Sequence, residues 1–336
     1  MRISTPSYVQ DALAKAGADG YAHLPSGHRF RLYLRGWKDD WAFDKKTALD
    51  GLIGVGAYER ECVQALNCRQ KMALDQVPED QRLSAVLVAD QSFVTGTGID
   101  HPLENGFAFL DPCGVPYLPG SSIKGVVRRA AEELVLLDDG SAWSLADLWL
   151  LFGFDAGSRY FDRPPDRSVA DPERQMWIRG YEAAVHRLRP EQLRLLEPLF
   201  ASAVRKTDLP PGEAGVRLAL ENRAHDGSFR ADVHWRGALA FWDAFPIVPQ
   251  GAGLEREMLN VHYQEYYGGR RAWPSDDGKL NPIEYLAIPA GAEFRFHVVH
   301  TQPAGAAAHL AWKGLVQSAF SHAAEWLGFG AKTSTG

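Results

Sequence analysis

The stretch PYLPGSSIKGVVRRAAEELVLL (116–137) decides how we expect the chain to fold. After Gly120 its apolar residues recur at the spacing of one helix face: Ile123, Val126, Val127, Ala130, Leu134 and Leu137. Two segments before it, RLSAVLVADQSFV (82–94) and NGFAFLD (105–111), have the β-branched and apolar content of strands. The order strand, turn, helix predicts the start of an α+β domain.

The start of this predicted helix carries hydroxyls and cations. Ser121 or Ser122 can supply the N-cap oxygen, and Lys124 and Arg128 lie four residues apart on one face. A helix N-terminus with two cations suits an anion. The segment lacks the GxxxxGK[ST] spacing of a P-loop, so we exclude nucleotide hydrolysis. A capped helix whose cations lie in water is the plain alternative.

Further strands are expected near the C-terminal end. GALAFWDAF (237–245) reads as a strand, and IEYLAIPAGAEFRFHVV (283–299) reads as a strand pair separated by a turn. A last helix is expected over 307–327. We predict that 82–94 and 237–245 lie in one antiparallel sheet with the 121–137 helix packed on it.

The chain divides into an extension and one domain with an insertion. Residues 1–80 are expected to be an N-terminal extension that is partly helical, interrupted by Gly51, Gly54 and Gly56. Residues 81–336 form the domain, with an insertion at about 154–236. The insertion contains helical patterns and proline pairs that do not suit a sheet, so we predict a helical lobe.

Composition narrows the class of protein. The formal net charge of −6 argues against coating nucleic acid by bulk electrostatics, although 28–38 and 124–129 are locally basic. No apolar run is long enough to span a bilayer, and the N-terminus has no secretory pattern, so we expect no membrane partner. The three cysteines have no metal-ligand spacing, which suits a reducing cytoplasm. We expect neither metal nor cofactor.

Four separated stretches resemble the RAMP superfamily of CRISPR proteins. They are TGTGIDHPLENGFAFLDPCGVPYLPGSSIKGVVRRA (95–130), then GALAFWDAFP, then VHYQEYYGG with NPIEYLAIPAGAEFRFHV, and last GFGAKTSTG (328–336). Within the superfamily they look like the family of the sixth subunit of type III-B (Cmr) effector complexes. This resemblance implies an RRM-like, ferredoxin-like core and a non-catalytic subunit of an RNA-guided antiviral complex in the cytoplasm.

The same resemblance implies partners and binding residues. The partners would be guide (CRISPR) RNA, bound near its 3′ end, target RNA, and other RAMP and small helical subunits, so that the chain supports assembly and target RNA capture. The implied RNA-binding residues lie in the helix start and the glycine-rich tail: Ser121, Ser122, Lys124, Arg128, Gly328, Gly330, Lys332, Thr333 and Ser334. For the tail, a helix C-cap followed by a mobile end is the plain alternative.

A second group is a candidate for RNA or subunit contact: His101, His262, Tyr266, Tyr267 and Arg270. Aromatic residues can stack on bases or pin a loop to a neighbouring surface. We assign no catalytic residue. Two other functions stay open, a metal-independent RAMP endoribonuclease that processes guide RNA and a protein-only adaptor. The endoribonuclease needs a general acid–base, for which His101 and His262 are the candidates.

Overall fold

The computed structural model describes residues 2–3, 5–15, 20–161, 171–261, 273, 281–302 and 311–331. Its centre is an antiparallel sheet with the strand order β3-β9-β6. The three strands are β3 (Arg82–Val88), β9 (Glu293–His300) and β6 (Leu239–Phe241). β3 and β9 pair without a register shift, and β6 pairs with the other edge of β9. The fold is therefore α+β, as predicted.

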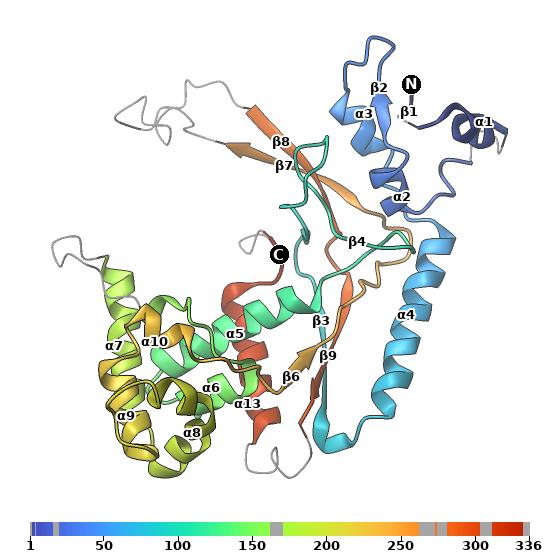
Figure 1. Ribbon diagram of the computed structural model, residues 1–336. Helices are drawn as coiled ribbons and strands as arrows, with labels where there is room; N and C mark the ends of the chain where they lie inside the picture. The colour runs from blue at the N-terminus through green and yellow to red at the C-terminus, as the bar shows by residue number, and fades with distance from the viewer. Residues whose placement is uncertain are drawn as a thin grey trace.

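Two helices cover one face of this sheet (Figure 1). They are α5 (Gly120–Leu136) and α13 (Trp312–His322), which continues into a π-helical turn, Ala323–Leu327. Ile123 and Val127 of α5 are buried in the main core, and the Phe320 ring of α13 lies 5.6 Å from the Phe296 ring of β9. The prediction of one antiparallel sheet under the 121–137 helix is confirmed, with shorter strands.

Other predicted strands pair differently. Of 105–111, only β4 (Phe109–Leu110) is a strand, paired with β5 (Val115–Pro116). The segment 283–299 supplies β8 (Asn281–Ala287) and β9, but these two have different partners. β8 pairs with β7 (Glu255–Val261), a strand that the sequence did not indicate because its residues EREMLNV are mostly polar. The β7–β8 pair extends away from the central sheet (Figure 1).

The N-terminal residues form several short elements and one long helix. They are β1 (Arg2–Ile3), α1 (Ser7–Lys15), α2 (Ser26–Arg31), β2 (Arg35–Trp37), α3 (Lys45–Asp50), α4 (Ala57–Asp75) and the 3₁₀ turn η1 (Glu79–Gln81). The glycines at 51, 54 and 56 separate α3 from α4, as expected. Leu49 and Leu52 belong to the main core, so this part of the chain packs against the rest.

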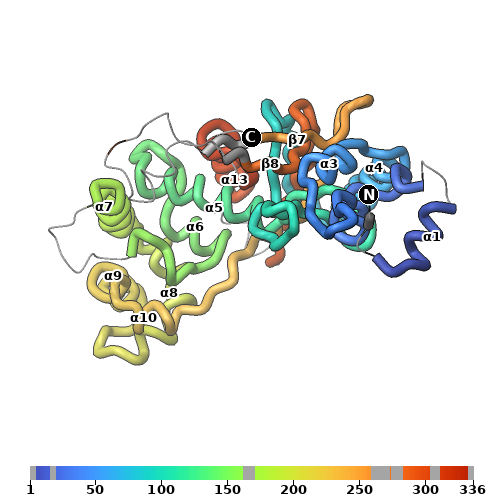
Figure 2. Tube along the Cα trace, turned by 90° about the horizontal axis from the view of Figure 1, so that it is seen from above, coloured from blue at the N-terminus to red at the C-terminus, as the bar shows by residue number. Residues whose placement is uncertain are grey.

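Between β5 and β6, beyond α5, the described residues are mainly helical. The elements are α6 (Leu145–Phe152), η2 (Arg159–Phe161), α7 (Pro172–His186), α8 (Pro190–Val204), α9 (Glu213–Asn222) and α10 (Gly227–Ala231). They lie at one end of the molecule, and α1, α3 and α4 lie at the other (Figure 2). The buried Trp149 and Phe200 join them to the main core. Among the helices that the structure describes, none is both long and apolar enough to cross a membrane.

Candidate nucleic-acid interface

The first turn of α5 is capped by a residue from a distant part of the chain. The helix begins at Gly120, and the Gly120 N–H donates to Oδ1 of Asp243 at 2.7 Å. The predicted serine N-cap is therefore wrong. A Cβ on Gly120 would lie 2.2 Å from the Phe241 carbonyl oxygen, so glycine permits the close approach that brings Asp243 to the helix end. This carboxylate already offsets the positive helix terminus, and Ser121 and Ser122 are exposed.

Lys124 is the cation of this helix start whose charge is free. Among the described residues, its ammonium has neither a hydrogen bond nor an ion pair. The side chain is half-buried, and burial lowers the pKa of Lys124, with the positive charges of Arg128 and Arg236 acting in the same direction. Binding of an anion would stabilise the charged form of this half-buried lysine, which lies beside two other positive charges.

Arg128 has a structural contact on each side. Its side chain is 16% exposed, and Nε donates to Oε1 of Glu132 at 3.1 Å. Its Nη1 donates to the carbonyl oxygen of Gly153 at 3.0 Å, which ties α5 to the end of α6. Burial raises the pKa of Glu132, while the charge of Arg128 opposes that rise. The guanidinium thus joins α5 to the end of α6. Because Nε and Nη1 already donate within the chain, Arg128 has fewer donors for a phosphate than we expected.

The glycine-rich tail lies against the sheet as far as it is described. Gly328 and Gly330 have φ values of 69° and 100°, which favour glycine. A Cβ on Gly330 would lie 2.6 Å from the Val94 carbonyl oxygen, and the Ala331 N–H donates to that oxygen at 2.7 Å. The two glycines therefore hold the chain close to the residues after β3. Lys332, Thr333 and Ser334 lie outside the described residues.

His101 has a structural position. Its ring stacks on Phe30, with centroids 3.6 Å apart. The Leu103 N–H donates to Nδ1 at 3.2 Å, so Nε2 carries the proton and donates to the Phe30 carbonyl oxygen at 2.9 Å. Burial lowers the pKa of His101, and the charge of Arg31 adds to this. A neutral ring with both nitrogens occupied is a poor general base. His262, Tyr266, Tyr267 and Arg270 lie outside the described residues.

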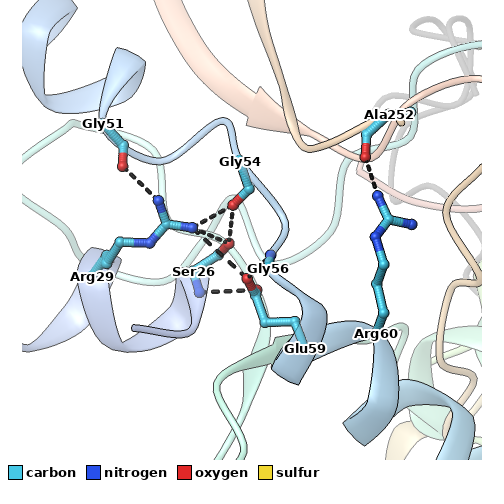
Figure 3. Close-up of polar contacts among 8 residues, drawn as sticks. All are labelled: Ser26, Arg29, Gly51, Gly54, Gly56, Glu59, Arg60 and Ala252. Atoms are coloured by element: carbon cyan, nitrogen blue, oxygen red, sulfur yellow. Dashed lines mark hydrogen bonds and ion pairs between the residues drawn. The ribbon is translucent and has the colours of Figure 1, made fainter. Parts of the chain in front are cut away.

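A buried ion pair that the sequence did not indicate fastens α2 to α4 (Figure 3). The side chains of Arg29 and Glu59 are 5% and 2% exposed, and Nη2 lies 3.8 Å from Oε2. Arg29 donates to the Gly51 carbonyl oxygen at 2.8 Å and also to that of Gly54. Glu59 accepts from the N–H groups of Ser26 and Gly56. Arginine in the basic stretch 28–38 was noted in the sequence, but nothing there indicated its burial.

One residue further along, Arg60 links α4 to the loop after β6. Its Nη1 donates to the carbonyl oxygens of Val248 at 3.1 Å and Pro249 at 3.3 Å. Its Nη2 donates to the carbonyl oxygen of Ala252 (Figure 3). Two consecutive residues of α4 therefore bind different parts of the chain: Glu59 binds α2, and Arg60 binds the loop after β6.

Histidine, cysteine and carboxylate side chains do not gather into a metal site in the described part of the chain. His297 and His300 of β9 show why. The Nδ1 of His297 lies 3.0 Å from the Ser84 hydroxyl, and its ring lies beside Trp242. The His300 ring lies beside Trp312 instead, on the helix-covered face. The two rings point to opposite faces, as their spacing along the strand predicts.

Comparison with known proteins identifies the family. The model of the RAMP superfamily matches residues 87–336. The chain is similar to the CRISPR system Cmr subunit Cmr6 of Pyrococcus furiosus, with 27% identity over 257 residues that cover 72% of this chain and 63% of the relative. The chain thus spans less than two thirds of that relative's length.

The chain also resembles parts of solved structures. A chain in the cryo-EM structure of the type III-B Cmr-beta complex bound to cognate target RNA has a TM-score of 0.46 and 14% identity, covering 86% of this chain and 68% of that chain. The crystal structure of Cmr6 from Pyrococcus furiosus has a TM-score of 0.30 and 21% identity, covering 75% of this chain and 94% of that chain. Since both scores are below 0.5, the family assignment rests on the sequence match. By that match, which takes in β6, β9 and the last two residues of β3, the chain belongs to the RAMP superfamily.

Proposed function

We propose that this chain is a non-catalytic subunit of a type III CRISPR RNA-guided effector complex. It binds guide RNA near the 3′ end of the guide and supports assembly and target RNA capture. Its partners are guide RNA, target RNA, other RAMP subunits and small helical subunits, in the cytoplasm. Membership of the superfamily and similarity to the Cmr6 protein support this assignment.

The observation that carries the proposal is the free charge of Lys124. Its half-buried side chain comes directly after the first turn of α5, near the exposed Ser121 and Ser122. The ammonium is available to a phosphate, and the serine hydroxyls can donate to phosphate oxygens. Contacts of this kind hold an RNA backbone without reading its sequence, as a subunit that accepts any guide requires.

The position of His101 supports the absence of catalysis. Metal-independent RNA cleavage needs a side chain that exchanges a proton with the reacting groups. Both nitrogens of His101 are instead committed to the backbone of Phe30 and Leu103. We therefore favour binding over the endoribonuclease, and target cleavage belongs to neighbouring subunits.

We also propose that the core is ferredoxin-like, within a domain of residues 81–336 that carries the 154–236 insertion and follows an N-terminal extension. The order β3-β9-β6, with α5 after the first strand and α13 after the third, matches strands one, three and two of a β-α-β-β-α-β unit. The Ala331–Val94 hydrogen bond is on the side where a fourth strand would pair.

The test uses the assembled complex, reconstituted with wild-type chain or with Lys124→Gln. We expect the variant to assemble but to retain less guide RNA at elevated salt, for guides of any sequence. His101→Ala serves as the matched test of chemistry and should leave guide maturation and target cutting intact. Full guide retention by Lys124→Gln would favour the adaptor, and loss of guide maturation in an assembled His101→Ala complex would favour the endoribonuclease.

A further inference from the structure

The segment that leads into β6 crosses the end of α6 at very close range. Gly153 and Arg236 form an isolated antiparallel bridge, and the Phe154 N–H donates to the Trp235 carbonyl oxygen at 3.2 Å. A Cβ on Gly237 would lie 2.2 Å from the carbonyl carbon of Phe152. The crossing therefore needs glycine, and it fixes the backbone of Arg236.

This crossing brings Arg236 to the side of α5. Arg128 of α5 holds the Gly153 carbonyl oxygen at 3.0 Å, and Gly153 is the bridge partner of Arg236. Burial, and after it the positive charges of Arg128 and Arg236, lower the pKa of Lys124, which lies one turn before Arg128. Lys124 and Arg236 are more than a hundred residues apart in the sequence, before and after the helices α6 to α10, and the fold brings their charges together.

The charges at this place are not balanced. The Arg236 side chain is exposed, and within the described residues it has no hydrogen bond or ion pair, as is also true of Lys124. Nη2 of Arg128 is buried with no partner. Three carboxylates lie in this region: Glu132 is held by Arg128, Asp155 is exposed, and Asp243 accepts from the Gly120 N–H at the helix end. Two free cations beside one neutralised arginine favour a bound anion.

We infer that Arg236 and Lys124 together bind one backbone phosphate of single-stranded RNA beside Gly153, with Arg128 as the positioning residue. This inference rests on the proposed function and changes where the RNA lies. The helix terminus is occupied by Asp243, so the phosphate sits on the side of the first turns of α5. Arg236 is the last residue of the predicted insertion, where the chain returns toward β6, so the RNA path would lie between the insertion and the core.

The test measures fluorescence anisotropy of a labelled 20-nucleotide poly-uridine RNA with the full chain over a salt series. The variants are Arg236→Gln, Lys124→Gln, the double variant, and Arg205→Gln as a matched control, an exposed arginine that follows α8. One lost phosphate contact should weaken binding about fourfold at 0.15 M salt and flatten the salt slope by roughly 0.7. Because both cations hold one phosphate, the double variant should lose less than the two single losses combined.

The outcomes separate this inference from the proposed function. Weaker binding by Lys124→Gln alone, with Arg236→Gln matching the Arg205→Gln control, overturns the role of Arg236 and leaves RNA binding in place. Wild-type affinity and salt slope in all variants overturn both. Where the isolated chain binds poly-uridine too weakly to titrate, guide RNA retained by the assembled complex over the same salt series decides with the same variants and the same criteria.

Discussion

Glu59→Gln tests whether the buried ion pair fastens the N-terminal elements to α4. The change keeps the shape of the side chain but removes the charge opposite Arg29. It also turns an amide NH₂ toward the N–H of Ser26 or Gly56, each of which now donates to a carboxylate oxygen at 2.9 and 3.0 Å. Breaking a buried pair by removing one partner costs about 3–5 kcal/mol.

We expect the lower end of that range, because Arg29 keeps the carbonyl oxygens of Gly51 and Gly54 as acceptors. A loss of about 3 kcal/mol is roughly a hundredfold in a local opening equilibrium. Hydrogen–deuterium exchange of peptides covering 24–32 and 52–60 should therefore become about a hundredfold faster, while peptides of α8 keep their protection.

Glu191→Gln is the matched control. Oε1 of Glu191 lies 3.3 Å from Nε of Arg189, and both side chains are largely exposed. An exposed pair contributes little, so its exchange pattern should equal that of the wild type. Equal protection of both N-terminal peptides in Glu59→Gln and the wild type would show that the pair contributes nothing to fastening α2.

Three further predictions concern packing, pH and chemistry. Gly120→Ala should lower the denaturant midpoint, because its Cβ would meet the Phe241 carbonyl oxygen. In the control Gly125→Ala, on the same helix, the new Cβ would have nothing within 4 Å, so its midpoint should equal or exceed that of the wild type. Equal midpoints for the two variants would contradict this. Burial lowers the pKa of His101 and His297, so between the lowered values and about 6.5 the unfolded chain binds protons that the folded chain does not. The free energy of unfolding should therefore fall as the pH drops below about 6.5, and less steeply in His101→Gln; an unchanged slope in urea titrations would count against it. Purified chain incubated with guide precursor RNA should yield no cleavage products, with or without chelator.

Much of the sheet and its helices could be predicted from local pattern. The change of period at Gly120 marked α5 correctly, because its buried residues follow one helix face. The pairing of β8 with β7 could not be predicted, since β7 is polar and its place depends on contacts far along the chain. The prediction of the α5 cap was wrong for the same reason, because the capping residue Asp243 follows Gly120 by 123 residues.

The candidate site was only partly predictable. Lys124 and Arg128 share a helix face, as their spacing indicated, but the sequence does not reveal that Glu132 and Gly153 already hold Arg128. Arg236 was not singled out, because its proximity to α5 arises from the crossing at Gly153. Spacing along one helix is local information, whereas the partner of each cation is set by tertiary packing.

Guide binding by this chain can be tested in the native complex by ultraviolet crosslinking, followed by sequencing of the RNA attached to the chain and mass spectrometry of the attached peptides. We expect guide RNA, crosslinked near its 3′ end, on peptides that contain the start of α5 and the segment around Arg236. Guide sequence should not matter. Recovery of this chain in the complex without crosslinked guide RNA, or with RNA only on surfaces far from α5, would contradict it.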